Sequence, residues 1–468
     1  MTHFIQSIRK AYHYFFLALK GEETEFTTGS INKAIFLLSV PMVLEMIMEA
    51  LFAVVDVYFV GKVSVDAVAT VGLTESVMMI VYSIAIGLSM AATAVVSRRV
   101  GEKEYKRAGD AAFQAIAIAA VLSIVISIVG IVYAEDILRL MGGSEKLIAN
   151  GFGYTRVMLG GNLCIMLLFL INAIYRGAGD ASMAMRSLWI ANGFNIILDP
   201  IFIFGLGPVP AFGVEGAAIA TTIGRSLGVF YQLFGLLGGE RIIQLGVDNI
   251  RLRWSTVKNI FGIAMGGMGQ FLIESASWLF LVRIISEFGS AALAGYTIAF
   301  RIIIFTILPS WGMANAAATL VGQNLGAKKP DRAERSVWIT AHLNTGFLFC
   351  VSVLFFIMAP EFVAIFTTDA VAVEHGSLAL RIICVGYITF AYGMVISQGF
   401  NGAGDTKTPT IMNVLFFWLI QIPLAYFLAI YMDFGFPGAI VSVSVAFGLH
   451  AMACIYWFRK GKWKLIEV

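Results

Sequence analysis

Long apolar segments, separated by short polar stretches, run through almost the whole chain of 468 residues. They are continuous rather than alternating between apolar and polar positions, which is typical of membrane helices and not of the strands of a membrane barrel. Because a bilayer span needs about 20 apolar residues, the sequence predicts an all-α integral membrane protein with twelve transmembrane helices. The expected spans are about 34–60, 67–96, 111–133, 155–175, 183–207, 213–237, 257–283, 291–321, 336–358, 378–400, 408–432 and 437–457.

The second half of the sequence repeats the first at an offset of 225 residues. The segment Arg176-Gly-Ala-Gly-Asp180 returns as Asn401-Gly-Ala-Gly-Asp405, and Glu49 in the first span corresponds to Glu274 in the seventh. Six spans per repeat place both halves the same way up, so we expect parallel repeats related by an axis along the membrane normal. This predicts two pseudo-symmetric six-helix lobes with a substrate cavity between them.

The predicted organisation therefore has five parts. They are a cytoplasmic N-terminal segment at 1–33, an N-lobe of helices 1–6 at 34–237, a polar and basic cytoplasmic connector at 238–256, a C-lobe of helices 7–12 at 257–457, and a basic cytoplasmic tail at 458–468. Within the first part, apolar residues fall on one helical face, which predicts an interfacial helix; a disordered tail is the alternative. That face comprises Phe4, Ile5, Ile8, Tyr12, Phe15, Phe16 and Leu19.

Composition supports the membrane assignment. The chain is 59% hydrophobic, has a mean hydropathy of +0.85 and is only 13% charged, whereas about a quarter of the residues of a soluble globular protein are charged. Lys and Arg gather in the loops after even-numbered spans, so the positive-inside rule predicts a multi-pass inner-membrane protein with both termini in the cytoplasm. The basic clusters are short and lack interleaved aromatic residues, so we expect a lipid bilayer and no nucleic acid as the partner surface.

Several kinds of chemistry are missing from the sequence. The four cysteines have no CxxC spacing, which argues against a disulfide framework and a zinc site. There is no phosphate-binding loop for an ATP-driven motor, no HExxH and no GxSxG nucleophile motif. The sequence therefore predicts neither catalytic residues nor a cofactor, and a membrane-embedded enzyme is disfavoured.

The first predicted span carries three acids, Glu45, Glu49 and Asp56. At 100° per residue they lie within about 40° of one another, so they form one stripe on the helix. A charge at the bilayer centre costs roughly 2.5–3.5 kcal/mol on insertion scales. These acids must therefore line a cavity or meet partners. The candidate counter-ions are the arginines within predicted spans, Arg225, Arg283, Arg301 and Arg381.

The fifth span adds Asn192, Asn195 and Asp199 on one face, and the sixth adds Thr221 and Thr222. Their carboxylate, carboxamide and hydroxyl oxygens are the hard ligands that Na⁺ accepts. A desolvated pair of carboxylates would equally well bind a proton, because two like charges repel and each loses its hydration. The residues alone thus leave H⁺ and Na⁺ open, with a structural polar knot between helices as the alternative, above all for Glu45.

These residues, in this order, resemble those of the multidrug and toxic compound extrusion (MATE) transporters, over about 34–457. The resemblance rests on Ser39-Val-Pro-Met42, Asp56-Val-Tyr-Phe-Val-Gly61, Arg98-Arg-Val-Gly101, Arg176-Gly-Ala-Gly-Asp180, Asn195-Ile-Ile-Leu-Asp-Pro200, Gly213-Val-Glu-Gly-Ala-Ala-Ile-Ala-Thr221, Gly322-Gln-Asn-Leu-Gly326 and Asn401-Gly-Ala-Gly-Asp405. It implies a secondary antiporter that exports cationic amphipathic compounds in exchange for H⁺ or Na⁺. It further implies an N-lobe cation site, possible for Na⁺, made by Asp56, Asn195, Asp199 and Thr221.

The resemblance also matches Glu274 to a C-lobe glutamate that other members use. The chain departs from those members in its tenth span, 382–400, which has no acid, and in the extra acids Glu45 and Glu49 of its first span. We expect these three glutamates to bind substrate or to take part in coupling. The alternative function is a flippase for lipid-linked precursors, whose cavity would be lined by Lys and Arg. Two lobes around one cavity make a monomer sufficient.

Overall fold

The computed structural model describes residues 12–21, 25–238 and 241–468. In the first half the helices are α2 (Ile31–Gly61), α3 (Val65–Gly101), α4 (Tyr105–Val132), α5 (Ala134–Leu140), α6 (Glu145–Gly160), α7 (Asn162–Ala178), α8 (Ala181–Phe204) and α9 (Val214–Leu237). In the second half they are η1 (Val247–Asn249), α10 (Trp254–Ser286), α11 (Ser290–Gly326), α12 (Pro330–Ile357), α13 (Ala359–Ala364), α14 (Ala370–Gly402), α15 (Lys407–Asn413), η2 (Val414–Gln421), α16 (Ile422–Tyr426), η3 (Phe427–Tyr431), α17 (Gly435–Arg459) and η4 (Lys462–Leu465).

Every predicted span falls on one of these helices or on a consecutive run of them. Among the described residues, ten stretches are long and apolar enough to cross a membrane, and α6 with α7, bent by 40°, makes an eleventh. That bend lies at Gly160 and Gly161, within the single span predicted at 155–175. The helix α9 is long enough but less apolar, because it carries Arg225 and Gln232 among its apolar residues. The all-helical membrane fold is confirmed.

The predicted interfacial helix is only partly within the described chain. Residues 12–20 are helical, whereas Phe4, Ile5 and Ile8 lie outside the described residues. The helix packs under the start of α2, where Ala18 and Ile35 join one apolar cluster. Its orientation at a lipid surface therefore stays a prediction.

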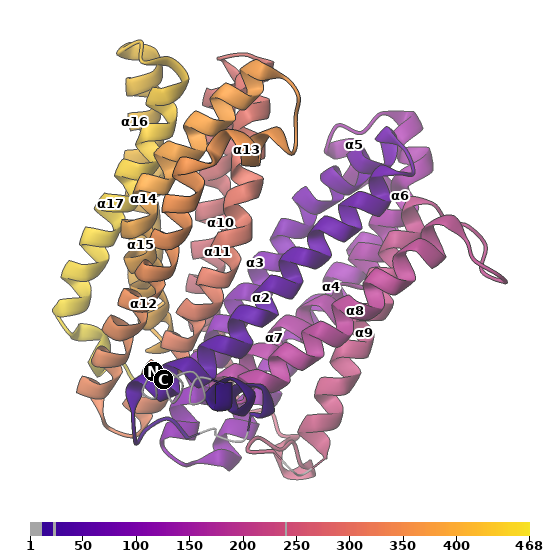
Figure 1. Ribbon diagram of the computed structural model, residues 1–468. Helices are drawn as coiled ribbons and strands as arrows, with labels where there is room; N and C mark the ends of the chain where they lie inside the picture. Colours follow the sequence, from indigo (N-terminus) through magenta and orange to yellow (C-terminus); the bar gives the residue numbers. More distant parts are fainter. Residues whose placement is uncertain (1–11, 22–24, 239–240) are drawn as a thin grey trace.

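The helices form two bundles that meet at the end of the molecule where both chain ends lie and diverge toward the end that carries α5 and α13 (Figure 1). One large apolar cluster draws on α2 to α9 and the start of α10, and two others draw on α10 to η4. We call α2–α9 the N-terminal bundle and α10–α17 the C-terminal bundle. The end where the bundles meet is called the terminus end, and the opposite one the far end.

The bundles contact each other reciprocally. The helix α3 packs along α10, and α11, at the repeat position of α3, packs along α2. Each contact is made by a glycine 225 residues from the other. A Cβ at Gly87 would lie 2.5 Å from the carbonyl oxygen of Ala264, and one at Gly312 would lie 2.6 Å from that of Met42. Such close backbone approach requires glycine, so the pseudo-symmetry predicted from the repeat extends to the interface.

At the terminus end α3 also crosses α11 with the same reciprocity. A Cβ at Gly101 would collide with the carbonyl oxygen of Gln323, and one at Gly326 would collide with that of Arg98. Both glycines and both carbonyl residues are related by the 225-residue offset. The two bundles are therefore closed against each other here by direct backbone contact.

The two chain ends exchange partners across this closed end. The Arg99 guanidinium, on α3, donates to the carbonyl oxygen of Val468 at 2.7 Å, and the Arg332 guanidinium, on α12, donates to that of Thr28 at 2.8 Å. Each bundle thus holds a terminal segment that belongs to the other half of the chain. These bonds add to the glycine crossing in holding the terminus end shut.

The glycine crossing makes a stability prediction. Gly326→Val would force a side chain into the backbone of α3, and overpacking of this kind costs about 1–3 kcal/mol. We expect a lower midpoint of thermal unfolding in detergent micelles. Gly346→Val is the matched control, since a Cβ there meets nothing within 4 Å. Equal midpoints for the two variants would contradict the close crossing.

Candidate functional site

A column of polar side chains runs through the interior of the N-terminal bundle, from the far-end half of α2 and α8 to the terminus end. Three helices carry most of it because each places its polar residues on one face: α2, α8 and α9. The column consists of Glu45, Glu49, Asp56, Asn172, Arg176, Ser187, Asn192, Asn195, Asp199, Thr221, Arg225 and Gln232.

The far-end part of the column contains the predicted cation residues on α8 and α9. Asn195 donates through its Nδ2 to the Thr221 hydroxyl at 2.9 Å. Asp199, one turn further along α8, is 0% exposed. Among the described residues, nothing donates a hydrogen bond to either carboxylate oxygen of Asp199 or to Oδ1 of Asn195. Buried acceptors without donors are costly, so this oxygen set fits a proton or a small hard cation.

Two further acids on neighbouring helices complete this part. Asp56 on α2 is half-buried and close enough to Asp199 for the two charges to interact. Glu75 on α3, also half-buried, interacts electrostatically with Asp56 and with Arg225. Glu75 was missed in the sequence, although an acid in the middle of the span 67–96 is itself a signal. Asp56 therefore interacts electrostatically with both Asp199 and Glu75.

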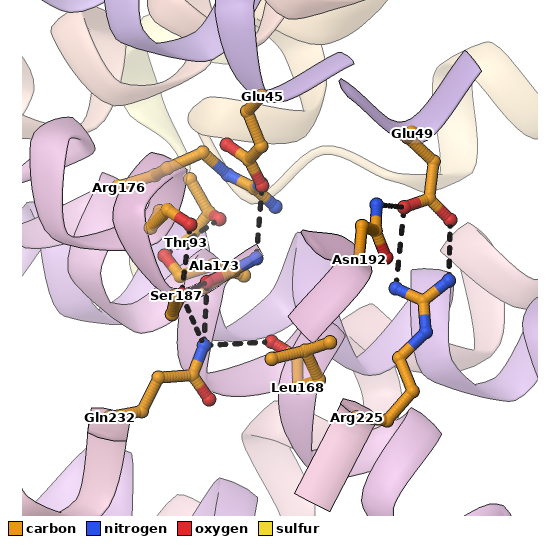
Figure 2. Close-up of polar contacts among 12 residues, drawn as sticks. Glu45, Glu49, Thr93, Leu168, Ala173, Arg176, Ser187, Asn192, Arg225 and Gln232 are labelled. Atoms are coloured by element: carbon orange, nitrogen blue, oxygen red, sulfur yellow. Dashed lines mark hydrogen bonds and ion pairs between the residues drawn. The ribbon is translucent and has the colours of Figure 1, made fainter. Parts of the chain in front are cut away.

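The second part of the column is an ion pair that the sequence did not specify. The Arg225 guanidinium donates to both carboxylate oxygens of Glu49, at 2.8 and 3.3 Å, and Asn192 Nδ2 donates to the same carboxylate at 2.9 Å (Figure 2). Arg225 also lies over the rings of Phe52 and Phe169, an arrangement that favours a desolvated cation. Glu49 is therefore neutralised inside the bundle, and Arg225 is its counter-ion.

The terminus-end part of the column is centred on Glu45. Its Oε1 accepts from Arg176 at 2.6 Å and from Asn172 at 3.0 Å, while its Oε2 has no donor among the described residues. Asn172 is bound in turn by Ser187 and Gln232, at 2.8 and 2.6 Å (Figure 2). Glu45 is therefore part of a hydrogen-bonded cluster between helices, which is the structural alternative that the sequence left open for it. One of its carboxylate oxygens has no donor in the described chain.

The C-terminal bundle has a much simpler interior. Glu274 on α10 is half-buried, and its carboxylate makes no hydrogen bond or ion pair with any residue that the structure describes. Position 192 of the N-terminal bundle corresponds to Phe417, which stacks on a histidine instead of binding a carboxylate. The structure therefore places Glu274 apart from the other predicted site residues, and Thr222, which bonds only to its own helix at Ala218, does not join the site.

Comparison with known proteins agrees with the arrangement of the helices. The family model MatE matches residues 41–201 and 268–427, more than half of the chain, in two segments that fall in the two bundles. The chain belongs to the MATE family of membrane transporters. It is a multi-pass membrane protein and not an enzyme.

Individual MATE proteins match nearly the whole chain. The probable multidrug resistance protein NorM of Thermotoga maritima is 26% identical over 442 residues, 93% of each chain. The multidrug export protein MepA of Staphylococcus aureus is 23% identical, covering 92% of this chain and 94% of that one. A solved structure of a multidrug resistance MATE transporter in its outward-facing conformation superposes with a TM-score of 0.88 at 26% identity, covering 94% and 98% of the two chains.

The Glu49–Arg225 pair makes a prediction for this MATE protein. Removing one partner of a buried pair leaves an uncompensated charge, which costs about 3–5 kcal/mol. Arg225→Gln should therefore destabilise the protein strongly, and Glu49→Gln/Arg225→Gln should recover most of the loss. Thermal unfolding in micelles measures both effects. Arg139→Gln, which breaks an exposed pair with Asp136, is the control and should leave the midpoint unchanged; additive losses in the double variant would contradict the pairing.

Proposed function

We propose that this MATE protein is a secondary antiporter that exports cationic amphipathic compounds in exchange for H⁺ or Na⁺. The observation that carries the proposal is the set of three buried oxygens, two of Asp199 and one of Asn195, that have no donor in the described chain. A cation bound there would satisfy all three and would neutralise a carboxylate that is otherwise costly at this depth. Asp56 and Thr221 supply the remaining oxygens.

Coupling follows from the relation of this site to the two bundles. The site lies between α2, α8 and α9, and α2 also packs along α11 of the C-terminal bundle. Neutralising the carboxylates changes the electrostatic free energy of the arrangement of α2 and α8. It thereby shifts the equilibrium between two states of the protein, one in which the bundles are closed at the terminus end and one in which they are closed at the far end. A cation and a substrate that prefer different arrangements are coupled for that reason alone.

The moving units that we propose are the N-lobe, 34–237, and the C-lobe, 257–457, joined by the connector at 238–256. The terminus end, with the segment 1–33 and the tail 458–468, would face the cytoplasm of the inner membrane, because Lys and Arg concentrate there. On that assignment the structure is closed toward the cytoplasm. One chain supplies both units, so a monomer suffices.

The substrate's positive charge would meet Glu274. This is an acid in a membrane helix with no partner among the described residues, whereas Glu45 and Glu49 are occupied by arginines. A flippase of anionic lipid-linked precursors is disfavoured, since the unpaired groups are acidic. We do not assign Glu45 and Glu49 to substrate binding.

Asp199→Asn tests the coupling site. We expect at least a tenfold loss of export driven by a gradient in proteoliposomes, with a pH gradient and a Na⁺ gradient imposed separately, because the amide can bind neither cation as a carboxylate does. The gradient that drives the wild type identifies the ion. Asp136→Asn, an acid at the far-end surface, is the control. Transport by Asp199→Asn at the control's rate would contradict the assignment.

Glu274→Gln tests the substrate site. Removing the half-buried Glu274 carboxylate, which has no partner in the described chain, should weaken binding of a lipophilic cation such as tetraphenylphosphonium at least tenfold, while an uncharged analogue of similar shape binds as before. Equilibrium binding to the purified protein measures both. Equal affinity of wild type and variant for the cation would show that its charge is recognised elsewhere.

A further inference from the structure

The polar column of the N-terminal bundle contains several oxygen acceptors without donors. Six buried side-chain oxygens in it have no hydrogen-bond donor among the described residues: Glu45 Oε2, Asn192 Oδ1, Asn195 Oδ1, both carboxylate oxygens of Asp199, and Gln232 Oε1. Three of them belong to the proposed coupling site. The others lie along the column between that site and the terminus end, so acceptors without donors are also found beyond the site itself.

The C-terminal bundle shows that the fold does not require this charge. Gln270 and Asn401 occupy the repeat positions of Glu45 and Arg176, at the offset of 225 residues. Gln270 Nε2 donates to Asn401 Oδ1 at 2.9 Å, and Asn401 Nδ2 donates back to Gln270 Oε1 at 3.2 Å. A neutral, mutually satisfied amide pair therefore holds the equivalent helices together. Glu45 and Arg176 make the equivalent contact in the N-terminal bundle, but as an ion pair it has a larger desolvation penalty.

The Glu45–Arg176 pair also lies directly at the closed interface. The backbone carbonyl of Arg176 accepts from the Thr319 hydroxyl of α11 at 3.1 Å, and the next carbonyl, of Gly177, accepts from Gln323 Nε2 at 3.2 Å. These two bonds cross from one bundle to the other. When the bundles separate at the terminus end, the bonds must break, and Arg176 and Glu45 come next to the space that opens.

We propose that Glu45 is a second proton site of the transporter, which receives the coupling proton from the Asp199 site and releases it at the terminus end. This rests on the proposed function. Glu45 takes the proton on its free Oε2, becomes neutral and loosens its bond to Arg176; loss of the proton to solvent restores the pair. One proton enters at Asp199 and one leaves at Glu45, so charge balances.

The surroundings of Glu45 favour a proton over Na⁺ at this second site. The charged groups that face it are Arg176 on α7 and Glu49, one turn away on α2 and itself paired with Arg225; the neighbouring groups Asn172, Ser187 and Gln232 are neutral. A metal ion passing from Asp199 would have to come close to both arginines. A proton needs only an oxygen that can accept it, and the donor-free Glu45 Oε2 is such an oxygen; no ion of that size has to be placed beside the arginines.

The C-terminal bundle supplies the test variant. Glu45→Gln/Arg176→Asn copies the Gln270–Asn401 pair, so it should fold, which thermal unfolding checks. After an acid jump, two signals are recorded from proteoliposomes loaded with a lipophilic cation: the fast charge displacement on a solid-supported membrane, and the steady efflux of that cation. A Na⁺ jump is the second arm. In the wild type we expect a fast displacement, from proton binding near Asp199, followed by steady efflux driven by protons. Arg283→Gln/Glu287→Gln, which neutralises an exposed pair in the other bundle, is the matched control and should behave as the wild type.

The expected result is a fast displacement in Glu45→Gln/Arg176→Asn with proton-driven efflux of the lipophilic cation at least tenfold slower. Efflux at the control's rate would overturn the proposal, as would loss of both the displacement and the efflux in a folded variant, or wild-type efflux driven by Na⁺ alone. If the double variant is not recovered folded, Glu45→Gln decides by the same criteria. A wild type in which neither gradient drives efflux would instead refute the proposed function.

Discussion

A carboxylate inside a membrane protein has to be neutralised, and this constraint governs the interior of the N-terminal bundle. The chain meets it in two ways. Glu45 and Glu49 are paired with arginines from other helices, at 2.6 and 2.8 Å. Asp199 has no such partner in the described chain. Fixed pairs hold helices together, whereas an unpaired acid depends on a cation from outside, so the second kind of neutralisation can respond to an ion gradient.

The two halves of the protein share their backbone contacts but differ in the polar residues of their interiors. The glycines that let α3 and α11 approach the opposite bundle are retained at equivalent positions. The turns after α7 and α14 are also retained, with Gly179 and Gly404 both in the left-handed region, at φ of 93° and 89°. In the column, by contrast, Arg176 has become Asn401 and Asn192 has become Phe417. Both halves therefore share the close backbone contacts, whereas the Glu45–Arg176 ion pair of the N-terminal bundle corresponds to a neutral amide pair in the C-terminal bundle.

Much of the fold could be predicted from the sequence. The length of the apolar segments follows from the thickness of the bilayer, and the 225-residue repeat indicates the pseudo-symmetry of the two halves. The break at Gly160–Gly161 was not predicted, since apolar residues continue through it. The acids of α2 were identified by their cost in lipid, but their partners were not. Which arginine reaches which acid depends on how α2, α7 and α9 pack, and the side chains involved are up to 176 residues apart. Glu75 was missed although its depth in a span marked it.

In the proposed mechanism, cation binding at Asp199 changes how the two bundles are arranged. The most direct measurement is the distance between spin labels at Leu140, the last residue of α5, and Ile365, which follows α13. Both side chains are exposed, and α5 and α13 lie at the far ends of the two bundles (Figure 1). We expect the distance distribution to shift when the coupling cation is added to the wild type and to stay fixed in Asp199→Asn. The same shift in both proteins would contradict a role of Asp199 in rearranging the bundles.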